Sequence, residues 1–178
     1  NYMITYEQFL KEGVYDPNIF KAVFLAGGPG SGKSFIAGRT MGGLGLKVIN
    51  SDDAFERYLK QEGLSLKMPE AETAERDVVR AKAKKVTIAK RGHAIEGSLC
   101  IIIDVTGHEY DKLANQATKL RQIGYDVSMV FVNTSLEVAL YRNEQRARSV
   151  QTSLVKKSWK DVQANMGKFQ NFFGARNF

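Results

Sequence analysis

Cysteine is almost absent from this chain, and long apolar runs are absent altogether. The 178 residues include one cysteine, Cys100, so no disulfide can form within the chain, which is typical of a reducing compartment. No apolar run approaches the length of a membrane span, and the N-terminal segment lacks a signal-peptide pattern. We therefore expect a soluble, cytoplasmic protein with no membrane partner, in which Cys100 is a small core residue of the apolar run 99–103.

Histidine is nearly as scarce, and low-complexity sequence is missing. His93 and His108 stand alone, with no second histidine at the spacing of a metal site, which argues against zinc or histidine-based catalysis. No repeat or linker divides the chain, and its length suits one domain covering residues 1–178. Another strand would be the natural continuation after the last helix-like stretch, so we expect the natural C-terminus to lie beyond Phe178.

Acidic residues are outnumbered by basic ones. The chain has 26 lysines and arginines against 19 aspartates and glutamates, which gives a net charge of +7. A positive surface favours polyanionic partners through steering and counterion release. Much of the basic charge lies in two helix-like stretches, 76–91 and 142–160. Two interpretations stay open for them: a contact surface for nucleic acid, or a solvated helix face.

Four of the 16 glycines lie in one motif. Residues 27–34 read GGPGSGKS and match the phosphate-binding pattern G-x-x-x-x-G-K-[ST] at every fixed position, with an apolar run before and a helix-compatible stretch after. In such a loop backbone N–H groups turn toward an anion, the lysine reaches the β- and γ-phosphates, and the last hydroxyl ligates Mg²⁺. We therefore predict binding of ATP and Mg²⁺ rather than a merely flexible turn, with Ser34 on the metal. The predicted nucleotide-binding residues are Gly28, Pro29, Gly30, Ser31, Gly32, Lys33, Ser34 and Phe35.

Strand-like and helix-like runs alternate along the chain, which is the pattern of a parallel sheet covered by helices. We predict an α/β fold with a doubly wound parallel sheet in three αβα layers, as in P-loop NTPases. The predicted strands are 23–26, 47–50, 99–104 and 127–133. The predicted helices are 6–11, 32–41, 54–61, 69–91, 110–123, 135–148 and 153–173, with a turn at 42–45.

Two features support the last helices. Thr134 and Glu137 have the spacing of a capping box, which would start a helix at the end of the fourth strand. Apolar residues recur at three- and four-residue steps in the last helix, and we expect them to pack on the sheet. They are Val155, Trp159, Val162, Met166, Phe169 and Phe173.

Two aspartates follow the second predicted strand, and ligands of open α/β sheets gather at the carboxyl ends of strands. Asp52 or Asp53 would face the phosphate loop from the acceptor side. A carboxylate there can accept a hydroxyl proton or orient the hydroxyl for in-line attack on the γ-phosphate. The alternative is that either aspartate merely caps the following helix.

Further polar residues follow the third and fourth strands. Asp104 ends a buried run and can hold Mg²⁺, directly or through water. Thr106 and Gly107, which follow it, would lie at the acceptor pocket. The alternative is that Asp104 is an ordinary turn residue. Arg142 and Arg146 are four residues apart, on one face of the predicted helix. They can act as arginine fingers supplied by the chain itself, or take part in surface ion pairs.

The order of these motifs resembles that of P-loop kinases of the zeta-toxin and polynucleotide 5′-hydroxyl kinase type, which are relatives of the nucleoside monophosphate kinases. The resemblance covers about residues 21–173, and the segment RNEQR at 142–146 is similar to one in phage polynucleotide kinases. It implies that Asp53, which precedes x-F, is the general base and that Arg146 binds the transferring phosphate. The segment 104–107 is similar to the sugar-nucleotide branch, where an acidic residue and T-G line the acceptor site.

The resemblance implies an Mg·ATP-dependent kinase with a hydroxyl acceptor. Polynucleotide kinases have an acceptor-binding arginine after the D-x-Y element, where this chain has Glu56. We therefore expect a nucleotide sugar or other small molecule as acceptor, with a polynucleotide 5′-hydroxyl as the alternative. A third hypothesis is an ATP-binding switch or weak ATPase that signals to a protein partner.

Overall fold

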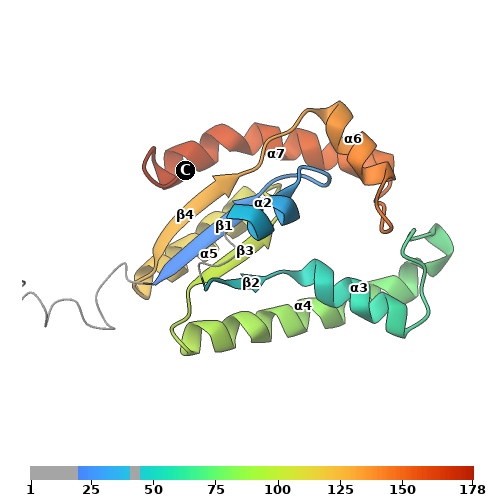
Figure 1. Cartoon of the computed structure of the whole chain (residues 1–178), viewed down its shortest axis with the longest axis horizontal. Coiled ribbons are helices and arrows are strands. Elements are labelled where there is room, and N and C mark those ends of the chain that lie inside the picture. The colour runs from blue at the N-terminus through green and yellow to red at the C-terminus, as the bar shows by residue number, and fades with distance from the viewer. Residues whose placement is uncertain (1–19, 41–44) are drawn as a thin grey trace, which may run out of the picture.

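Parallel strands form the centre of the computed structural model, which describes residues 20–40 and 45–178 (Figure 1). The strands are β1 (Lys21–Ala26), β2 (Lys47–Ile49), β3 (Ile101–Val105) and β4 (Asp126–Phe131). They lie in the order β2-β3-β1-β4, and all pairs are parallel. Phe24 and Leu25 of β1 point to opposite faces and are both buried, as a central parallel strand requires. This confirms the predicted fold class, and each strand lies within two residues of its expected bounds.

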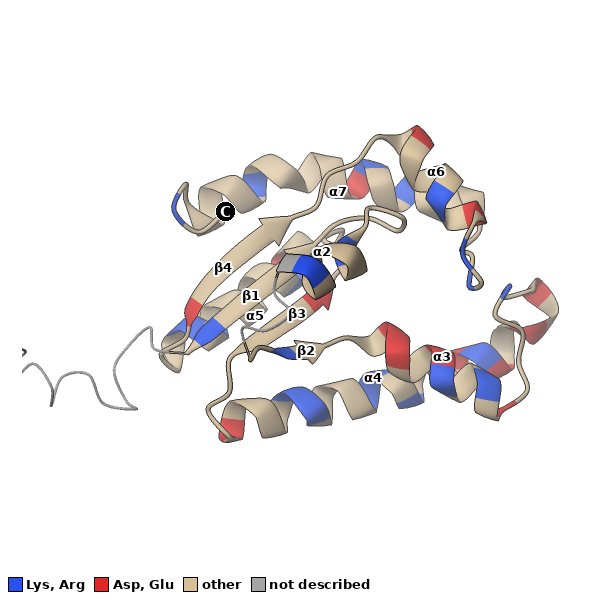
Figure 2. Cartoon of the chain, in the orientation of Figure 1, with Lys and Arg blue, Asp and Glu red and all other residues tan. Residues whose placement is uncertain are grey.

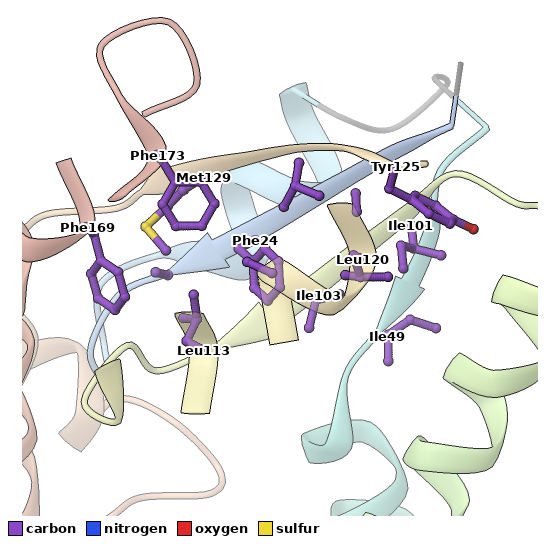
Figure 3. Packing of buried hydrophobic residues seen from close by; sticks show 14 of the residues in the cluster. Phe24, Ile49, Ile101, Ile103, Leu113, Leu120, Tyr125, Met129, Phe169 and Phe173 are labelled. Atoms are coloured by element: carbon purple, nitrogen blue, oxygen red, sulfur yellow. The ribbon is translucent and has the colours of Figure 1, made fainter. Parts of the chain in front are cut away.

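Helices cover both faces of the sheet. They are α2 (Lys33–Thr40), α3 (Ser51–Gln61), the 3₁₀ turn η1 (Glu70–Glu72), α4 (Thr73–Glu96), α5 (Tyr110–Gln122), α6 (Leu136–Glu144) and α7 (Thr152–Phe173). On one face, Ile36 of α2 packs near Leu25. On the other face, Leu113 of α5 and Phe169 of α7 join Phe24 in the main core, as Figure 3 shows. Because the strands are parallel, the carboxyl ends of the central strands lie together at one edge of the sheet.

α3 and α4 form a helical hairpin beside β2 (Figure 1). Phe55 and Leu59 of α3 are buried against Val79 and Ala83 of α4. The sequence predicts one helix over 69–91, whereas the structure has a separate 3₁₀ turn before α4. The hairpin therefore has its own small core, and it carries residues of α3 and α4 to one side of the strand ends.

The helix expected over 135–148 begins one residue later and ends four residues earlier than predicted. The Ser135 hydroxyl accepts the N–H of Val138 at 3.3 Å, so Ser135 is the N-cap, and the capping box of Thr134 and Glu137 does not form. The helix ends at Glu144 because the Asn143 side chain holds the Val150 backbone. Its amide donates to the Val150 carbonyl at 2.7 Å and its oxygen accepts the Val150 N–H at 2.9 Å, which folds the chain into a loop.

The predicted stripe of α7 is confirmed. Val155, Val162, Phe169 and Phe173 are buried, and Trp159 and Met166 are half-buried. The position of Cys100 differs from the prediction: it is half-buried just before β3, and its Sγ accepts the Lys21 N–H at 3.3 Å.

Some predictions fall on other parts of the chain. The expected helix 6–11 lies outside the described residues, as does the turn 42–45 apart from Gly45. Within the described residues, no helix combines the length and the apolarity that crossing a membrane requires.

Candidate active site

The phosphate loop connects β1 to α2 at the carboxyl end of the central strand. Gly30 and Gly32 have φ angles of 77° and 102°, which only glycine adopts without strain. A Cβ on Gly30 would also collide with the backbone of Ala139 in α6. The hydroxyl of Ser31 is buried and has no hydrogen-bond partner within the described part of the chain. The loop thus has the backbone geometry of an anion site at a helix N-terminus and an unused polar group in its wall.

Lys33 begins α2 and points back over the loop. Its Nζ donates to the Gly27 carbonyl at 2.6 Å and lies 3.9 Å from Oδ1 of Asp104. Burial lowers the pKa of Lys33, and the negative charge of Asp104 partly offsets this. A buried ammonium with few partners is well placed to bind an anion such as a phosphate group.

Asn50 links the end of β2 to the end of β3. Its Nδ2 donates to Oδ2 of Asp104 at 3.1 Å, and its Oδ1 accepts the N–H of Asp52 at 2.7 Å. Burial raises the pKa of Asp104 to about 6, although nearby Lys33 opposes the shift. Asn50 is the N-cap of α3, so the alternative that Asp52 or Asp53 caps this helix is wrong.

Asp52 and Asp53 lie in the first turn of α3 and differ in their partners. Oδ2 of Asp52 is 2.7 Å from Nη2 of Arg148, which comes from the loop after α6. Asp53 is exposed and makes no ion pair with any residue that the structure describes. The two neighbouring carboxylates are therefore not equivalent, and Asp53 is the one whose oxygens remain open.

Arg142 and Arg146 do not share a helix face as predicted, because α6 ends at Glu144. Arg142 remains on the helix, and its Nη1 donates to the Ser31 carbonyl at 3.2 Å. Arg146 lies in the following loop, where its carbonyl accepts Nζ of Lys67 at 3.3 Å. Arg142 therefore holds the phosphate loop in place, while Arg146 reaches the same region from the loop after α6.

These residues surround a cavity of about 750 Å³, within the range of small-molecule sites. It collects most of the predicted site residues, namely Gly28, Pro29, Gly30, Ser31, Gly32, Lys33, Ser34, Asp52, Asp53, Asp104, Thr106, Arg142 and Arg146. Gly107 lines an adjoining cavity of about 210 Å³ that shares Asp52, Asp104 and Thr106. Phe35 lines neither cavity; it is 63% exposed and packs against Arg39.

Ser34 and Asp104 are the residues predicted to hold Mg²⁺, and each carries side-chain oxygen. Both line the larger cavity. Within residues 20–40 and 45–178, no group of three or more histidines, cysteines or carboxylates could enclose an ion. This donor set fits Mg²⁺, which is commonly held by one or two protein oxygens together with substrate phosphates.

Other residues of the site had no motif to reveal them. Arg76 and Arg80 of α4 line the larger cavity, although the sequence placed them only in a basic stretch; their four-residue spacing was the available signal. Asn165 of α7 is buried and donates to the carbonyls of Gly107 and His108 at 3.2 and 2.9 Å. It holds the turn after β3, and its spacing of three residues from Val162 and four from Phe169, which places it on the apolar stripe, was the available signal.

A phosphate loop after the central strand, with the strand order β2-β3-β1-β4, defines a P-loop kinase-like domain. The chain belongs to a family described as an AAA domain, whose model matches residues 23–169. No curated protein matches the sequence.

Several solved structures are similar to the chain. A chain of the Pnkp1/Rnl/Hen1 RNA repair complex has a TM-score of 0.65 and 23% identity over 85% of this chain and 47% of that one. A chain of AvrRxo1-ORF1:-ORF2 with ATP has a TM-score of 0.69 and 14% identity over 90% and 52%. A chain of the PezAT chromosomal toxin–antitoxin system of Streptococcus pneumoniae has a TM-score of 0.55 and 16% identity over 90% and 69%.

The chain spans about half the length of the first two of these structures. At these identities the similarity concerns the fold. Together with the family match, it confirms the resemblance to P-loop kinases that the motif order predicted.

Proposed function

We propose that this chain is an Mg·ATP-dependent kinase that transfers the γ-phosphate to a hydroxyl group of an acceptor. The observation that carries the proposal is the cavity of about 750 Å³ that the phosphate loop shares with Asp53 and Arg146. A nucleotide-dependent switch needs the loop and a metal carboxylate. It does not need an open carboxylate and arginines in the same cavity, so this arrangement favours transfer.

On the donor side, the loop N–H groups and Lys33 would bind the phosphates of ATP. Ser34 and Asp104 would hold Mg²⁺, which neutralises phosphate charge when it is bound. In this proposal, Nζ of Lys33 leaves the Gly27 carbonyl, to which it donates in the structure, and donates to a phosphate oxygen bound in the loop. Arg142 keeps the loop in place through the Ser31 carbonyl.

On the acceptor side, Asp53 takes the proton of the acceptor hydroxyl. The hydroxyl oxygen then forms a bond to the γ-phosphorus while the bond from this phosphorus to the β–γ bridging oxygen breaks, and ADP leaves. Arg146 stabilises the negative charge of the group in transfer. Asp53 suits the role of proton acceptor better than Asp52, which is engaged with Arg148.

We further propose a small molecule, such as a nucleotide sugar, as the acceptor. The adjoining cavity of about 210 Å³, which Thr106 and Gly107 line beside Asp52, supports this because it can hold a compact part of the acceptor next to the reacting groups. A polynucleotide is the second candidate. Exposed lysines on α4 and α7, among them Lys84, Lys85 and Lys156, favour it because they can contact a phosphate backbone.

Transfer of label from ATP tests the proposal. The protein is incubated with Mg²⁺ and γ-³²P-ATP together with separate pools of nucleotide sugars, nucleosides and 5′-hydroxyl oligonucleotides. We expect a labelled acceptor in one pool, most readily the nucleotide sugars. Release of label to water alone, at a rate that no pool changes, would contradict the kinase and favour the switch.

A further inference from the structure

Three arginines without an assigned role line the larger cavity. Arg76 and Arg80 are four residues apart on α4 and therefore lie on the same side of the helix. Arg148 comes from the loop after α6. Figure 2 shows basic segments on both the α3–α4 hairpin and this loop. Guanidinium groups from two distant parts of the sequence are thus brought to one place.

Arg80 is the least engaged of the three. Its guanidinium carbon lies 4.3 Å from the centre of the Phe55 ring, and Phe55 is buried in the hairpin core. Among the residues that the structure describes, Arg80 makes no hydrogen bond and no ion pair. Its five N–H groups are therefore available to a ligand in the cavity.

Arg148 and Arg76 are held in place beside it. Arg148 lies 5.8 Å from the same Phe55 ring and pairs with Asp52; its side chain is only 13% exposed. Arg76 donates to the Pro69 carbonyl at 2.8 Å and to the Thr73 hydroxyl at 3.1 Å. Side chains held in this way lose little further freedom when they bind an anion.

The larger cavity is lined by six basic residues and only four carboxylates. Among the carboxylates of α3, Asp52 pairs with Arg148 and Glu56 lies 3.0 Å from Lys60, whereas Asp53 makes no ion pair with a residue that the structure describes. Burial lowers the pKa of the Arg80 guanidinium; repulsion from Arg148 and Arg76 adds to this, while Asp52 and Asp77 oppose it. A bound anion would relieve the crowding of like charges.

We propose that Arg76, Arg80 and Arg148 form an anion subsite for the acceptor, which therefore carries a phosphate group in addition to the hydroxyl that is phosphorylated. The inference rests on the proposed kinase function. The planar guanidinium fork suits phosphate oxygens. Asp53 lines the same cavity as the three arginines, so one molecule can present its hydroxyl to Asp53 and its phosphate to the arginines.

Binding measurements test the subsite without requiring turnover. Calorimetric titrations are made with the phosphate loop saturated by Mg²⁺ and the non-hydrolysable analogue AMPPNP. The probes are adenosine against adenosine 3′-monophosphate, glucose against UDP-glucose, and a 5′-hydroxyl decathymidylate. We expect a phosphorylated probe to bind at least tenfold more tightly than its unphosphorylated partner, since each charge-assisted contact is worth about this factor. Tighter binding of the decathymidylate than of adenosine 3′-monophosphate and UDP-glucose would show that the subsite binds a phosphate of a polynucleotide backbone.

Arginine variants locate the subsite. Arg80→Gln and Arg76→Gln should each remove most of the preference for phosphate, whereas Arg80→Lys should keep part of it. Arg57→Gln is the matched control, because Arg57 packs on the Tyr58 ring of α3 at 5.0 Å but does not line the cavity. Thermal unfolding of each variant shows whether the fold is intact.

The outcomes separate this inference from the kinase proposal. Equal binding, or no binding, of both members of every pair overturns the subsite even if labelled phosphate is transferred. A phosphate preference that survives Arg80→Gln and Arg76→Gln overturns it as well. Conversely, a preference that these variants remove supports the subsite even if no probe accepts phosphate, and then the kinase proposal alone fails.

Discussion

Arg148 and Asp52 form an ion pair, with Nη2 and Oδ2 2.7 Å apart, that joins the loop after α6 to the first turn of α3. Both residues line the larger cavity. The pair occupies one of two adjacent carboxylates and leaves Asp53 open. Because the sequence presents Asp52 and Asp53 as near equivalents, this contact is what distinguishes their expected roles.

Replacing Asp53 by asparagine should separate catalysis from binding. Asp53→Asn keeps the shape of the side chain but removes the proton acceptor, so we expect kcat to fall by about 10²–10⁴. The Kd of Mg·ATP should change by less than about twofold, because no contact to the phosphate loop is lost. Steady-state kinetics and a nucleotide titration measure the two quantities.

Asp52→Asn is the control for this experiment. It weakens a contact to Arg148 but leaves Asp53 in place, so its effect on kcat should be clearly smaller. If Asp53→Asn lost ATP affinity and kcat to the same degree, Asp53 would serve the metal or the structure instead of the proton transfer.

Lys33→Ala should weaken the binding of Mg·ATP. Lys33 is buried beside the loop and close to Asp104, and contacts from a charged donor contribute about 1.5–3 kcal/mol each. We expect the Kd to rise by at least about tenfold, measured by titration with a fluorescent ATP analogue. Lys21→Ala is the matched control, since Lys21 begins the strand that leads into the loop and its side chain, which is 53% exposed, pairs with half-buried Asp126. Unchanged affinity of Lys33→Ala would remove the nucleotide-binding assignment.

The parts predictable from the sequence are those that depend on local pattern. The loop 27–34 combines glycine spacing with a lysine and a hydroxyl, and the stripe on α7 repeats at helical spacing, so a few neighbouring residues specify each. The carboxyl ends of β1 and β3 then meet because parallel strands align them. The sequence alone therefore places Asp104 near Lys33.

The parts that could not be predicted depend on contacts between distant residues. The Asn143 side chain ends α6 by hydrogen bonding to the Val150 backbone, and this contact cannot be predicted from an asparagine in a helix-like stretch. Arg80 reaches the cavity because α4 packs on Phe55 of α3. From the sequence, the basic stretch 76–91 could be a nucleic-acid contact surface or a solvated helix face, whereas Arg76 and Arg80 line the cavity.

Asp104 should make the stability of the metal-free protein depend on pH. Burial raises its pKa from 3.8 to about 6, so between these values the folded state binds more protons than the unfolded state. The contribution of Asp104 to the free energy of unfolding is therefore highest at low pH and falls as the pH rises to about 6. Asp104→Asn cannot ionise, so above pH 6 it should raise the free energy of unfolding by about 1–3 kcal/mol, since one pKa unit corresponds to about 1.4 kcal/mol.

Urea unfolding between pH 5 and 8 without Mg²⁺ measures this effect. Asp126→Asn serves as the control, because its exposed ion pair with Lys21 should contribute less than about 1 kcal/mol. The same Asp104→Asn variant should bind Mg·ATP more weakly, so stability and affinity should move in opposite directions. A variant that is less stable than the wild type at pH 8 would show that Asp104 is a structural residue.

Reversing charges on α4 should decide between the two acceptor classes. With a polynucleotide acceptor, Lys84→Glu combined with Lys85→Glu should weaken oligonucleotide binding uniformly across sequences and leave ATP binding unchanged. Each lost phosphate contact should also reduce the slope of log K against log salt by about 0.7 for single strands. Lys119→Glu with Lys168→Glu, exposed residues of α5 and α7, is the charge-matched control. We expect instead that oligonucleotides bind weakly and with a flat salt dependence, because five arginines of the two basic stretches line the cavity and not the outer surface. A steep slope that only the α4 variant reduces would establish the polynucleotide acceptor.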